Sequence, residues 1–296
     1  MPFSSFEFRQ VKDSFKSVLQ AGFSPSEIQL MWKLSVEEFL GISPTEQLTS
    51  NALILTEPQV STLKGITARL LNKEPFQYIL GEVEFYNLSL KIDPRALIPR
   101  PETEELVDWI VKDYKDSASH VLDVCSGSGC IALALSDCFD NAQVLALESS
   151  EGAVMLSQEN ATALKLPAEF RQLDVLNKKE LELFLKNKTA SNGLFDVVVS
   201  NPPYIPFKEK EMMDSVVLEH EPELALFVSD EDPLLFYKAI AGAVLPYLST
   251  NGSLYFECHY IYLDKTRELL LSLGFNTVEK RKDLQGKWRM LKAQKS

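Results

Sequence analysis

The stretch Ser200–Pro206, SNPPYIP, directly follows the apolar run FDVVV and has an unusual balance of hydrogen-bonding groups. Its consecutive prolines remove two backbone N–H donors, so the stretch is rich in acceptors. Asn201 Oδ1 and the carbonyl of Pro202 are two acceptors that can hold both N–H bonds of a primary amide or an exocyclic amino group, and Tyr204 offers a flat face for stacking. The pattern favours a site for an –NH₂ substrate over a plain proline-rich turn.

A second group of residues, in VLDVCSGSGCIALAL, has the pattern of a ligand-binding loop. Asp123 ends an apolar run, and Gly127 and Gly129 stand in the turn before a predicted helix, where small residues let the backbone approach a ligand. Glu148 ends the next apolar run, at a place where an acid can accept hydrogen bonds from ribose hydroxyls. The alternative for Glu148 is an ordinary helix-capping carboxylate.

The type of ligand follows from what this loop lacks. It is neither G-x-G-x-x-G nor the Lys-Ser/Thr loop of a P-loop, and the carboxylate of Asp123 is unsuited to a bound phosphate. An adenosine with a cationic tail, such as S-adenosylmethionine, fits better than NAD or ATP. Methyl transfer to a gripped nitrogen needs positioning more than acid–base chemistry, so we expect no catalytic triad, no metal and no essential histidine.

The elements that must hold these residues are alternating strands and helices. HVLDV, AQVLALE, FDVVVS and GSLYFE read as strands, with helices expected at 131–138, 152–164 and 233–248 between them. The pattern predicts an α/β fold with a doubly wound, mainly parallel, seven-stranded sheet. The closing FNTVEKRKDLQGKWRMLKA predicts a C-terminal antiparallel hairpin.

The first part of the chain has a different pattern. Ser24 and Ser43 each begin a capping box with a following proline, and 57–72 has helical periodicity. EVEFYNLSLKID alternates like a hairpin with Asn87 near its turn. We expect a small helical bundle over 1–80 that docks the substrate, a β-hairpin connector over 81–100, and the ligand-binding domain over 101–296.

Composition restricts the possible partners and cellular location. Lys and Arg total 30 against 42 Asp and Glu, a net charge of −12, which argues against coating of nucleic acid. The N-terminus lacks the pattern of a secretory leader, and no apolar run is long enough to span a membrane. The four cysteines form no C-x-x-C pair. We expect a cytoplasmic monomer with reduced thiols, no membrane contact and no direct nucleic-acid binding.

With these motifs identified, the chain resembles the HemK-type protein-(glutamine) methyltransferases over nearly its whole length. The resemblance rests on EPFQYILGEVEFYNLSLKIDPRALIPRPETEELV, LDVCSGSGCIALAL, NPPYIP, YFE and KDLQGKWRML. It implies an S-adenosylmethionine-dependent enzyme, leaving S-adenosylhomocysteine as product. It also implies methylation of the glutamine in the Gly-Gly-Gln motif of peptide chain release factors, which modulates translation termination.

The resemblance also implies roles for individual residues. The cofactor would be contacted by Cys125, Ser126, Gly127, Ser128, Gly129, Glu148, Val175 and Asn201. The target glutamine would be held by Asn201, Pro202, Pro203 and Tyr204, of which Asn201, Pro202 and Tyr204 would be catalytic.

Three of these residues depart from the family pattern. Cys125 stands at a usual glycine, Glu148 at a usual aspartate, and Val175 where an aromatic residue can flank the adenine. The small side chain of Cys125 should still permit cofactor binding, and Glu148 should still reach the ribose.

Several residues and functions stay open at this point. Arg100, Glu102 and Glu104 fit either the mouth of the site or a simple helix start, and His259 has no assigned role. N-methylation of a nucleic-acid base needs the same acceptor loop but should bring a basic recognition surface. A non-catalytic nucleotide-binding module is the third alternative, and the intact Asn201 and Tyr204 argue against it.

Overall fold

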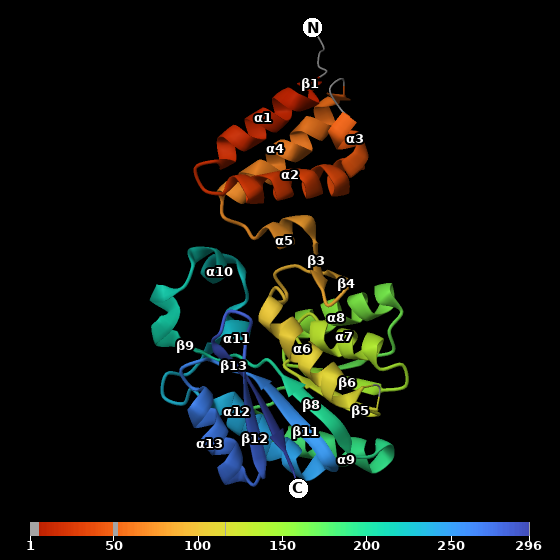
Figure 1. Ribbon diagram of the computed structural model, residues 1–296, viewed down its shortest axis with the longest axis vertical. Coiled ribbons are helices and arrows are strands. Elements are labelled where there is room, and N and C mark those ends of the chain that lie inside the picture. The colour runs from red at the N-terminus through yellow and green to blue at the C-terminus, as the bar shows by residue number, and fades with distance from the viewer. Residues whose placement is uncertain (1–5, 50–52, 116, 296) are drawn as a thin grey trace. The chain divides into compact units, whose positions relative to one another are not determined.

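The computed structural model describes residues 6–49, 53–115 and 117–295 of the chain. The chain divides into two compact units, residues 1–81 and 82–296, whose helices and strands are labelled in Figure 1. Residues 1–5, part of the stretch from which we predicted that a leader is lacking, lie outside the described residues.

The first unit is a helical bundle, as predicted. Its elements are β1 (Phe6–Glu7), α1 (Phe8–Leu19), α2 (Pro25–Leu40), α3 (Pro44–Thr49), β2 (Ile54–Leu55), α4 (Glu57–Leu71) and α5 (Phe76–Leu80). Trp32 lies at its centre. The rings of Phe8 and Phe15 pack edge-on against it, with their centroids 5.2 and 5.3 Å from the centroid of the Trp32 ring. Both predicted capping boxes are present, at Ser24 and Ser43. The short β1–β2 pair was not predicted.

The second unit begins with the predicted hairpin. Strands β3 (Glu82–Phe85) and β4 (Leu88–Lys91) pair antiparallel, and Tyr86 and Asn87 form the turn with φ of 47° and 66°. Two backbone contacts join the hairpin to later helices: Lys91 N–H donates to Asn160 at 2.7 Å, and Tyr86 N–H donates to Glu104 at 3.1 Å.

The rest of the second unit is built around a seven-stranded sheet of order β12-β13-β11-β8-β5-β6-β7. Its strands are β5 (His120–Val124), β6 (Gln143–Glu148), β7 (Glu169–Gln172), β8 (Phe195–Ser200), β11 (Leu248–Glu257), β12 (Thr277–Lys282) and β13 (Trp288–Gln294). The pairs from β11 through β7 are parallel, and β13 runs antiparallel to both of its neighbours. The predicted doubly wound sheet with a closing antiparallel hairpin is confirmed.

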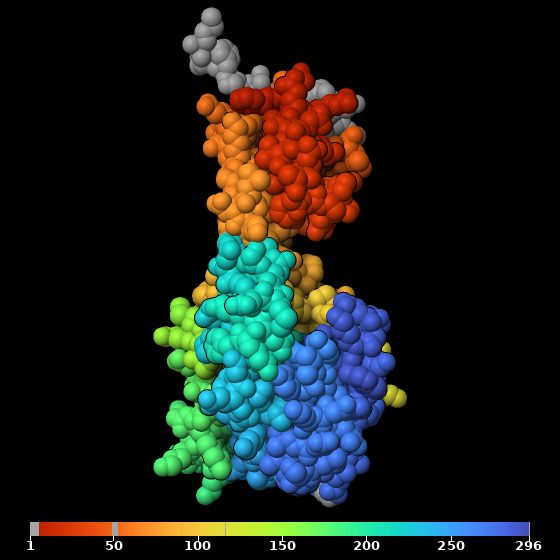
Figure 2. Space-filling view, turned by 90° about the vertical axis from the view of Figure 1, so that its left-hand side faces the viewer, coloured from red at the N-terminus to blue at the C-terminus, as the bar shows by residue number. Residues whose placement is uncertain are grey.

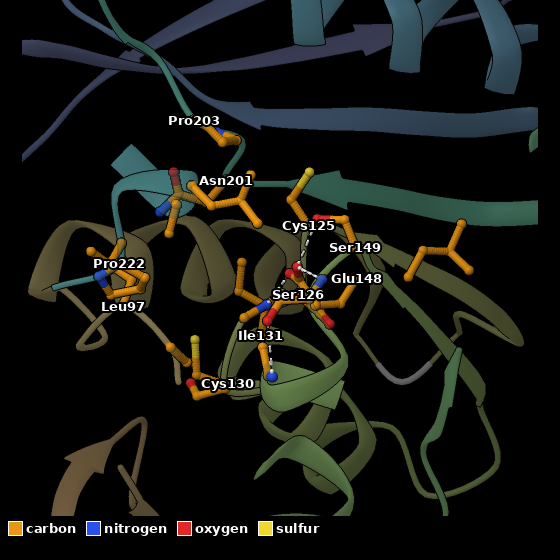
Figure 3. A pocket seen from close by; sticks show the side chains of 18 of the residues that line it. Leu97, Cys125, Ser126, Cys130, Ile131, Glu148, Ser149, Asn201, Pro203 and Pro222 are labelled. Carbon is orange, nitrogen blue, oxygen red and sulfur yellow. Dashed lines mark hydrogen bonds between the residues drawn. The ribbon is translucent and has the colours of Figure 1, made fainter. Parts of the chain in front are cut away.

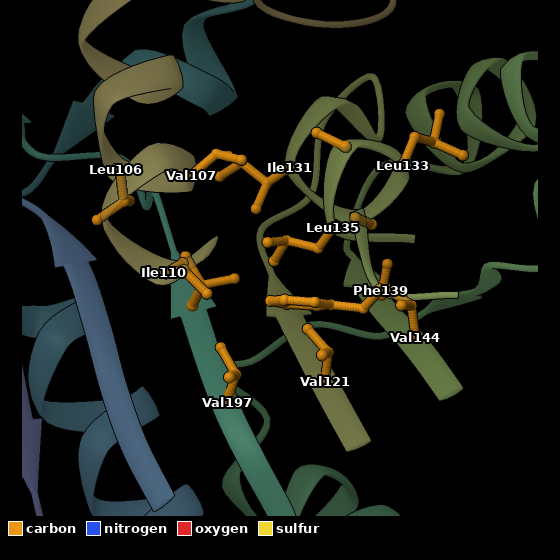
Figure 4. Close-up of a cluster of buried hydrophobic side chains, with 14 of the residues drawn as sticks. Leu106, Val107, Ile110, Val121, Ile131, Leu133, Leu135, Phe139, Val144 and Val197 are labelled. Carbon is orange, nitrogen blue, oxygen red and sulfur yellow. The ribbon is translucent and has the colours of Figure 1, made fainter. Parts of the chain in front are cut away.

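Helices cover both faces of this sheet. One face carries α6 (Pro101–Tyr114), α7 (Cys130–Cys138) and α8 (Glu151–Leu164), and the buried side chains between α6, α7 and the strands are drawn in Figure 4. The other face carries α9 (Lys178–Asn192), α12 (Leu235–Val244) and α13 (Leu263–Leu273). Two apolar layers therefore hold the strands rigidly and fix the loops at their ends.

Two parts of this unit differ from the sequence-based expectation. The helix expected at 233–248 is shorter, because a 3₁₀ turn, η2 (Leu245–Tyr247), ends it and β11 begins at Leu248. The segment after SNPPYIP folds into β9 (Ile205–Pro206), η1 (Phe207–Met212), α10 (Ser215–His220), α11 (Glu223–Leu226) and β10 (Phe227–Val228), none of which was predicted. Figure 2 shows this segment, in teal, at the surface of the second unit.

Among residues 6–49, 53–115 and 117–295, none of the helices has both the length and the apolar character required to cross a bilayer.

Candidate active site

A cavity of about 330 Å³ opens at the carboxyl ends of β5, β6 and β8 (Figure 3). In open parallel sheets this edge is where ligands bind, and the volume lies in the usual range for small-molecule sites. Strand register explains why the cavity forms here: Val124 pairs with Ser200 on one side and with Leu147 on the other, so β5, β8 and β6 end within one residue of one another. The residues that follow them are therefore brought together at the cavity.

The loop after β5 has a backbone that ordinary side chains adopt only under strain. Gly127 and Gly129 have φ of 54° and 81°, and Cys125, between strand and loop, has φ of 63°. Such values cost a non-glycine residue about 1–2 kcal/mol. A glycine would adopt this conformation without strain, whereas this chain carries a small thiol there, whose pKa burial raises.

Within this loop, Cys125, Ser126, Gly127 and Ser128 line the cavity, whereas Gly129 lies behind it. A Cβ at Gly129 would be 2.9 Å from both the Phe170 ring and Ser157 Cβ. Gly129 therefore permits α7 to begin close against α8 and β7, and its role is to place the loop.

Asp123 and Ser126 supply polar atoms without partners at this loop. Asp123 Oδ2 accepts the Ala132 N–H at 3.1 Å, but Asp123 Oδ1 and Ser126 Oγ are buried without a hydrogen bond among the described residues. Burial, with the Glu148 carboxylate adding to it, raises the pKa of Asp123 to about 8. Orphaned buried groups are costly, and of these two residues only Ser126 lines the cavity, so Ser126 Oγ fits a hydrogen-bonding group of a ligand whereas Asp123 lies outside the lining.

Glu148 connects the end of β6 to the loop. Its carboxylate accepts the N–H of Gly127 and the N–H of Ser150, both at 2.9 Å (Figure 3). The Ser149 hydroxyl also donates to Glu148 Oε1 at 3.2 Å. These three bonds leave about one acceptor site free, because an ionised carboxylate offers about four. Glu148 also lines the cavity, where ligand hydroxyls are within its reach.

Val175 lies in the apolar part of the cavity wall. It is 4% exposed and is accompanied there by Leu147, Leu173 and Leu176. The wall next to the acidic Glu148 is thus made of aliphatic side chains, a surface suited to the flat face of an adenine.

The residues after β8 lie beside the cavity. Asn201 and Pro203 line it, while Pro202 and Tyr204 are outside its lining. The Tyr204 hydroxyl donates to Glu257 Oε1 at 3.0 Å, and burial together with that carboxylate raises the pKa of Tyr204. Its hydroxyl is therefore kept neutral and held away from the cavity.

Thr103 and Glu257 are site neighbours that the sequence reasoning missed. Asn201 Nδ2 donates to Thr103 Oγ1 at 3.2 Å, and Thr103 Oγ1 donates to Glu257 Oε2 at 2.7 Å. Glu257 was inside the quoted YFE and Thr103 inside PETEE, but their meeting depends on β8 and β11 ending where α6 begins. The only sequence signal is an acid at the end of an otherwise apolar strand.

At the start of α6, Arg100 and Thr103 line the cavity, whereas Glu102 and Glu104 do not. Arg100 forms an ion pair with Glu221 at 2.6 Å, and the other oxygen of Glu221 accepts the Ile98 N–H at 3.2 Å. Glu221 is 5% exposed, and the following Pro222, Leu224 and Ala225 form part of the cavity wall. Glu221 thus fastens that wall to the start of α6.

Glu102, Glu104 and His259 bond away from the cavity. Glu102 accepts from Gln285 at 3.3 Å, and Glu104 holds the hairpin turn. His259 Nδ1 accepts the Ile261 N–H, so its Nε2 carries the proton that it shares with Glu209 at 3.0 Å. The His259 ring also contacts Tyr204 edge-on at 5.9 Å and so supports the tyrosine from behind.

Comparison with known proteins gives consistent results for both units. Residues 103–220 match the model of the methyltransferase small domain, and residues 15–81 match that of the PrmC N-terminal domain. A protein of Flavobacterium psychrophilum named release factor glutamine methyltransferase is 36% identical over 96% of this chain and 98% of its own length.

A protein of the same name from Bacteroides thetaiotaomicron is 38% identical over 93% of this chain and 95% of its own length. Among solved structures, a T. thermophilus 16S rRNA methyltransferase in complex with AdoMet and guanosine covers 73% of this chain and 50% of its own, with a TM-score of 0.50 at 18% identity. That likeness concerns the fold alone.

Proposed function

The chain belongs to the release factor glutamine methyltransferase family, and we propose that it methylates the side-chain amide nitrogen of the glutamine in the Gly-Gly-Gln motif of peptide chain release factors. It is an S-adenosylmethionine-dependent methyltransferase. The observation that carries the proposal is the arrangement of Asn201, whose amide nitrogen is hydrogen-bonded to Thr103 while the residue lines the cavity beside the start of the Gly-rich loop.

In this proposal the residues after β8 grip the substrate amide. Asn201 Oδ1 and the Pro202 carbonyl accept its two N–H bonds, which aims the nitrogen lone pair into the cavity. Pro202 and Pro203 have no N–H to compete, and Tyr204 and Pro203 supply flat surfaces beside the amide. The proton lost from the product nitrogen passes to these acceptors or to water.

The cofactor residues are proposed from the cavity wall. Cys125, Ser126, Gly127 and Ser128 hold the cofactor with their backbone, with Gly129 placing the loop, and Glu148 accepts from the ribose hydroxyls. Val175 lies against the adenine, and Ser126 receives the amino-acid tail. When bound, S-adenosylmethionine supplies an electrophilic methyl group on sulfur, so the protein needs to orient and desolvate the nucleophile more than to activate it.

The first experiment is mass analysis of a release factor incubated with the protein and S-adenosylmethionine. A single added methyl on the glutamine of Gly-Gly-Gln is expected, and a Gln→Ala version of the factor is the control. Transfer to another residue, or label entering DNA or RNA in a parallel reaction and not the factor, would refute the proposal.

We propose further that the unit 1–81 docks the release factor, while 82–100 connects it to the catalytic domain 101–296. Loss of residues 1–81 should weaken release-factor binding and leave cofactor affinity unchanged, with circular dichroism to check that 82–296 is folded. Equal factor affinity of both forms would contradict this role. We also propose a cytoplasmic monomer without membrane contact, and the net charge of −12 supports action on protein without direct nucleic-acid binding.

A further inference from the structure

Three side chains from separate parts of the second unit form one hydrogen-bonded chain that runs from Asn201 and Thr103 in the cavity wall to the buried Glu257. Glu257, at the end of β11, accepts from Thr103 in the first turn of α6, and Thr103 accepts from Asn201 after β8. Thr103 is 2% exposed and Glu257 is 1% exposed, so water does not compete for these bonds. The proposed function gives no role to the bond between Thr103 and Glu257.

The direction of these bonds follows from the atoms available. An ionised carboxylate has acceptors only, and a threonine hydroxyl has one proton. Because Glu257 takes the proton of Thr103, the hydroxyl of Thr103 has only lone pairs left for Asn201. A lone pair can be met by the amide NH₂ of Asn201 and not by its oxygen.

The planar amide of Asn201 then has one orientation. With Nδ2 directed at Thr103, Oδ1 lies on the other edge of the amide, and Asn201 itself lines the cavity. Turned by 180°, the amide would place an N–H donor toward a substrate –NH₂, so that two donors would face each other. Leaving a buried polar group unpaired in this way costs about 1–3 kcal/mol.

Each carboxylate oxygen of Glu257 accepts a hydrogen bond from a hydroxyl group, although the pKa of this buried acid is raised overall. Burial raises the pKa of Glu257, whereas the hydroxyls of Thr103 and Tyr204 and the positive charge of Arg289 oppose that effect. Arg289 is itself held by Asp283 at 3.3 Å. Tyr204 donates to the second oxygen of the same carboxylate, so one group holds two residues of the substrate grip.

We propose that Thr103 and Glu257 are positioning residues that fix the amide of Asn201 with its oxygen toward the substrate. The proposal rests on the proposed function, because it assigns the orientation of the acceptor that grips the glutamine amide. Neither residue needs to touch the substrate or the cofactor for this role.

The test compares Thr103→Val, which keeps the shape but removes the hydroxyl, with Thr103→Ser, which restores it. Tyr255→Phe is the matched control, because it removes a buried hydroxyl that donates to Asp113 at 2.7 Å from the same strand as Glu257 but away from the cavity. Two readouts are taken: kcat for release-factor methylation, and the side-chain NH₂ signals of Asn201 in ¹⁵N-asparagine-labelled protein without ligand. The spectrum of Asn201→Ala identifies those signals.

Thr103→Val should lower kcat by at least about 10-fold, the effect of about 1.4 kcal/mol, with cofactor affinity unchanged. It should also shift the Asn201 NH₂ signals and speed their hydrogen exchange, since the bond to Thr103 is lost. Thr103→Ser should return both readouts to within about 3-fold of wild type, as expected for a retained acceptor. Tyr255→Phe should change neither readout.

A Thr103→Val enzyme with wild-type kcat, or with a lowered kcat but unchanged Asn201 signals, overturns the proposal. A different failure belongs to the proposed function: the wild-type protein then transfers no methyl to the release factor. In that case the Asn201 signals alone decide whether Thr103 orients the amide.

Discussion

Gly129 lies so close to Phe170 that an added Cβ would approach the ring Cε1 at 2.9 Å, whereas Gly127, two residues earlier, has nothing within 4 Å of the same position. Both have positive φ, 81° and 54°. The two glycines are therefore required for different reasons. Gly127 is needed for its backbone conformation alone, whereas Gly129 is needed both for its conformation and because a side chain would collide with its neighbours.

Gly129→Ala should consequently destabilise the protein far more than Gly127→Ala. We expect about 1 kcal/mol for Gly127→Ala from the strained backbone, and about 2–4 kcal/mol for Gly129→Ala, where overpacking adds to the strain. Urea unfolding of the two variants measures the difference. Equal midpoints would show that the Phe170 ring moves aside without cost.

Asn201→Ala should separate chemistry from cofactor binding. The variant loses one of two proposed acceptors, so kcat should fall by at least about 10²-fold, the scale of a lost positioning contact, while cofactor affinity stays nearly intact. Single-turnover methylation and calorimetric titration of the cofactor measure the two quantities. Asn192→Ala, at the exposed end of α9, is the control. Wild-type turnover by Asn201→Ala would contradict the proposal that Asn201 Oδ1 accepts a hydrogen bond from the substrate amide.

Asp123→Asn should remove a pH dependence of stability. The folded pKa of Asp123 is raised by burial to about 8, above an unfolded value of about 3.9, so the folded state binds the extra proton between these values. The contribution of Asp123 is therefore full below about pH 4 and is lost as the pH rises toward 8, by up to about 1.4 kcal/mol per pH unit.

Unfolding free energies at pH 5.5 and 7.5, taken as the difference between wild type and Asp123→Asn, isolate this effect. The variant, which resembles the protonated acid, should gain stability relative to wild type at the higher pH. A difference that does not change with pH would mean that Asp123 is ionised in the folded protein throughout the range.

Glu221→Ala should weaken cofactor binding although Glu221 does not line the cavity. It leaves the Ile98 N–H and Arg100 without the carboxylate that holds them, and loosens the wall formed by Pro222 and the residues after it. We expect an increase in Kd of about 10-fold, corresponding to one lost charge-assisted hydrogen bond. The control is Glu223→Ala, two residues along the chain from Glu221, which removes an exposed ion pair with Lys210. It should leave the cofactor Kd within about 2-fold of the wild-type value. Equal Kd values for the two variants would contradict the fastening role.

Much of the architecture could be predicted from sequence because the central strands are apolar on both faces. HVLDV and FDVVVS match β5 and β8 residue for residue, since buried parallel strands stand out against their polar loops. Strand β7, EFRQ, escaped individual identification because it is a sheet edge where only Phe170 is buried.

The site was predictable to the extent that it lies within short motifs. The loop 125–129, Glu148 and Asn201 each follow a strand, so the parallel sheet alone brings them to one edge. Thr103, Glu221 and Glu257 could not be found this way, because their contacts join segments more than 90 residues apart. The left-handed backbone at Cys125 was also hidden, since a cysteine gives no signal of it.

The position of β11 between β8 and β13 has a consequence for the order in which the chain is made. β13, residues 288–294, is synthesised after the other strands of this sheet, and it completes the pairing of the strand that ends in Glu257. During translation the loop 125–129 and Asn201 exist well before that neighbour does. A nascent chain, or one truncated at Asp283, should therefore remain catalytically silent, a state that methyl transfer by ribosome-released fragments of increasing length would reveal.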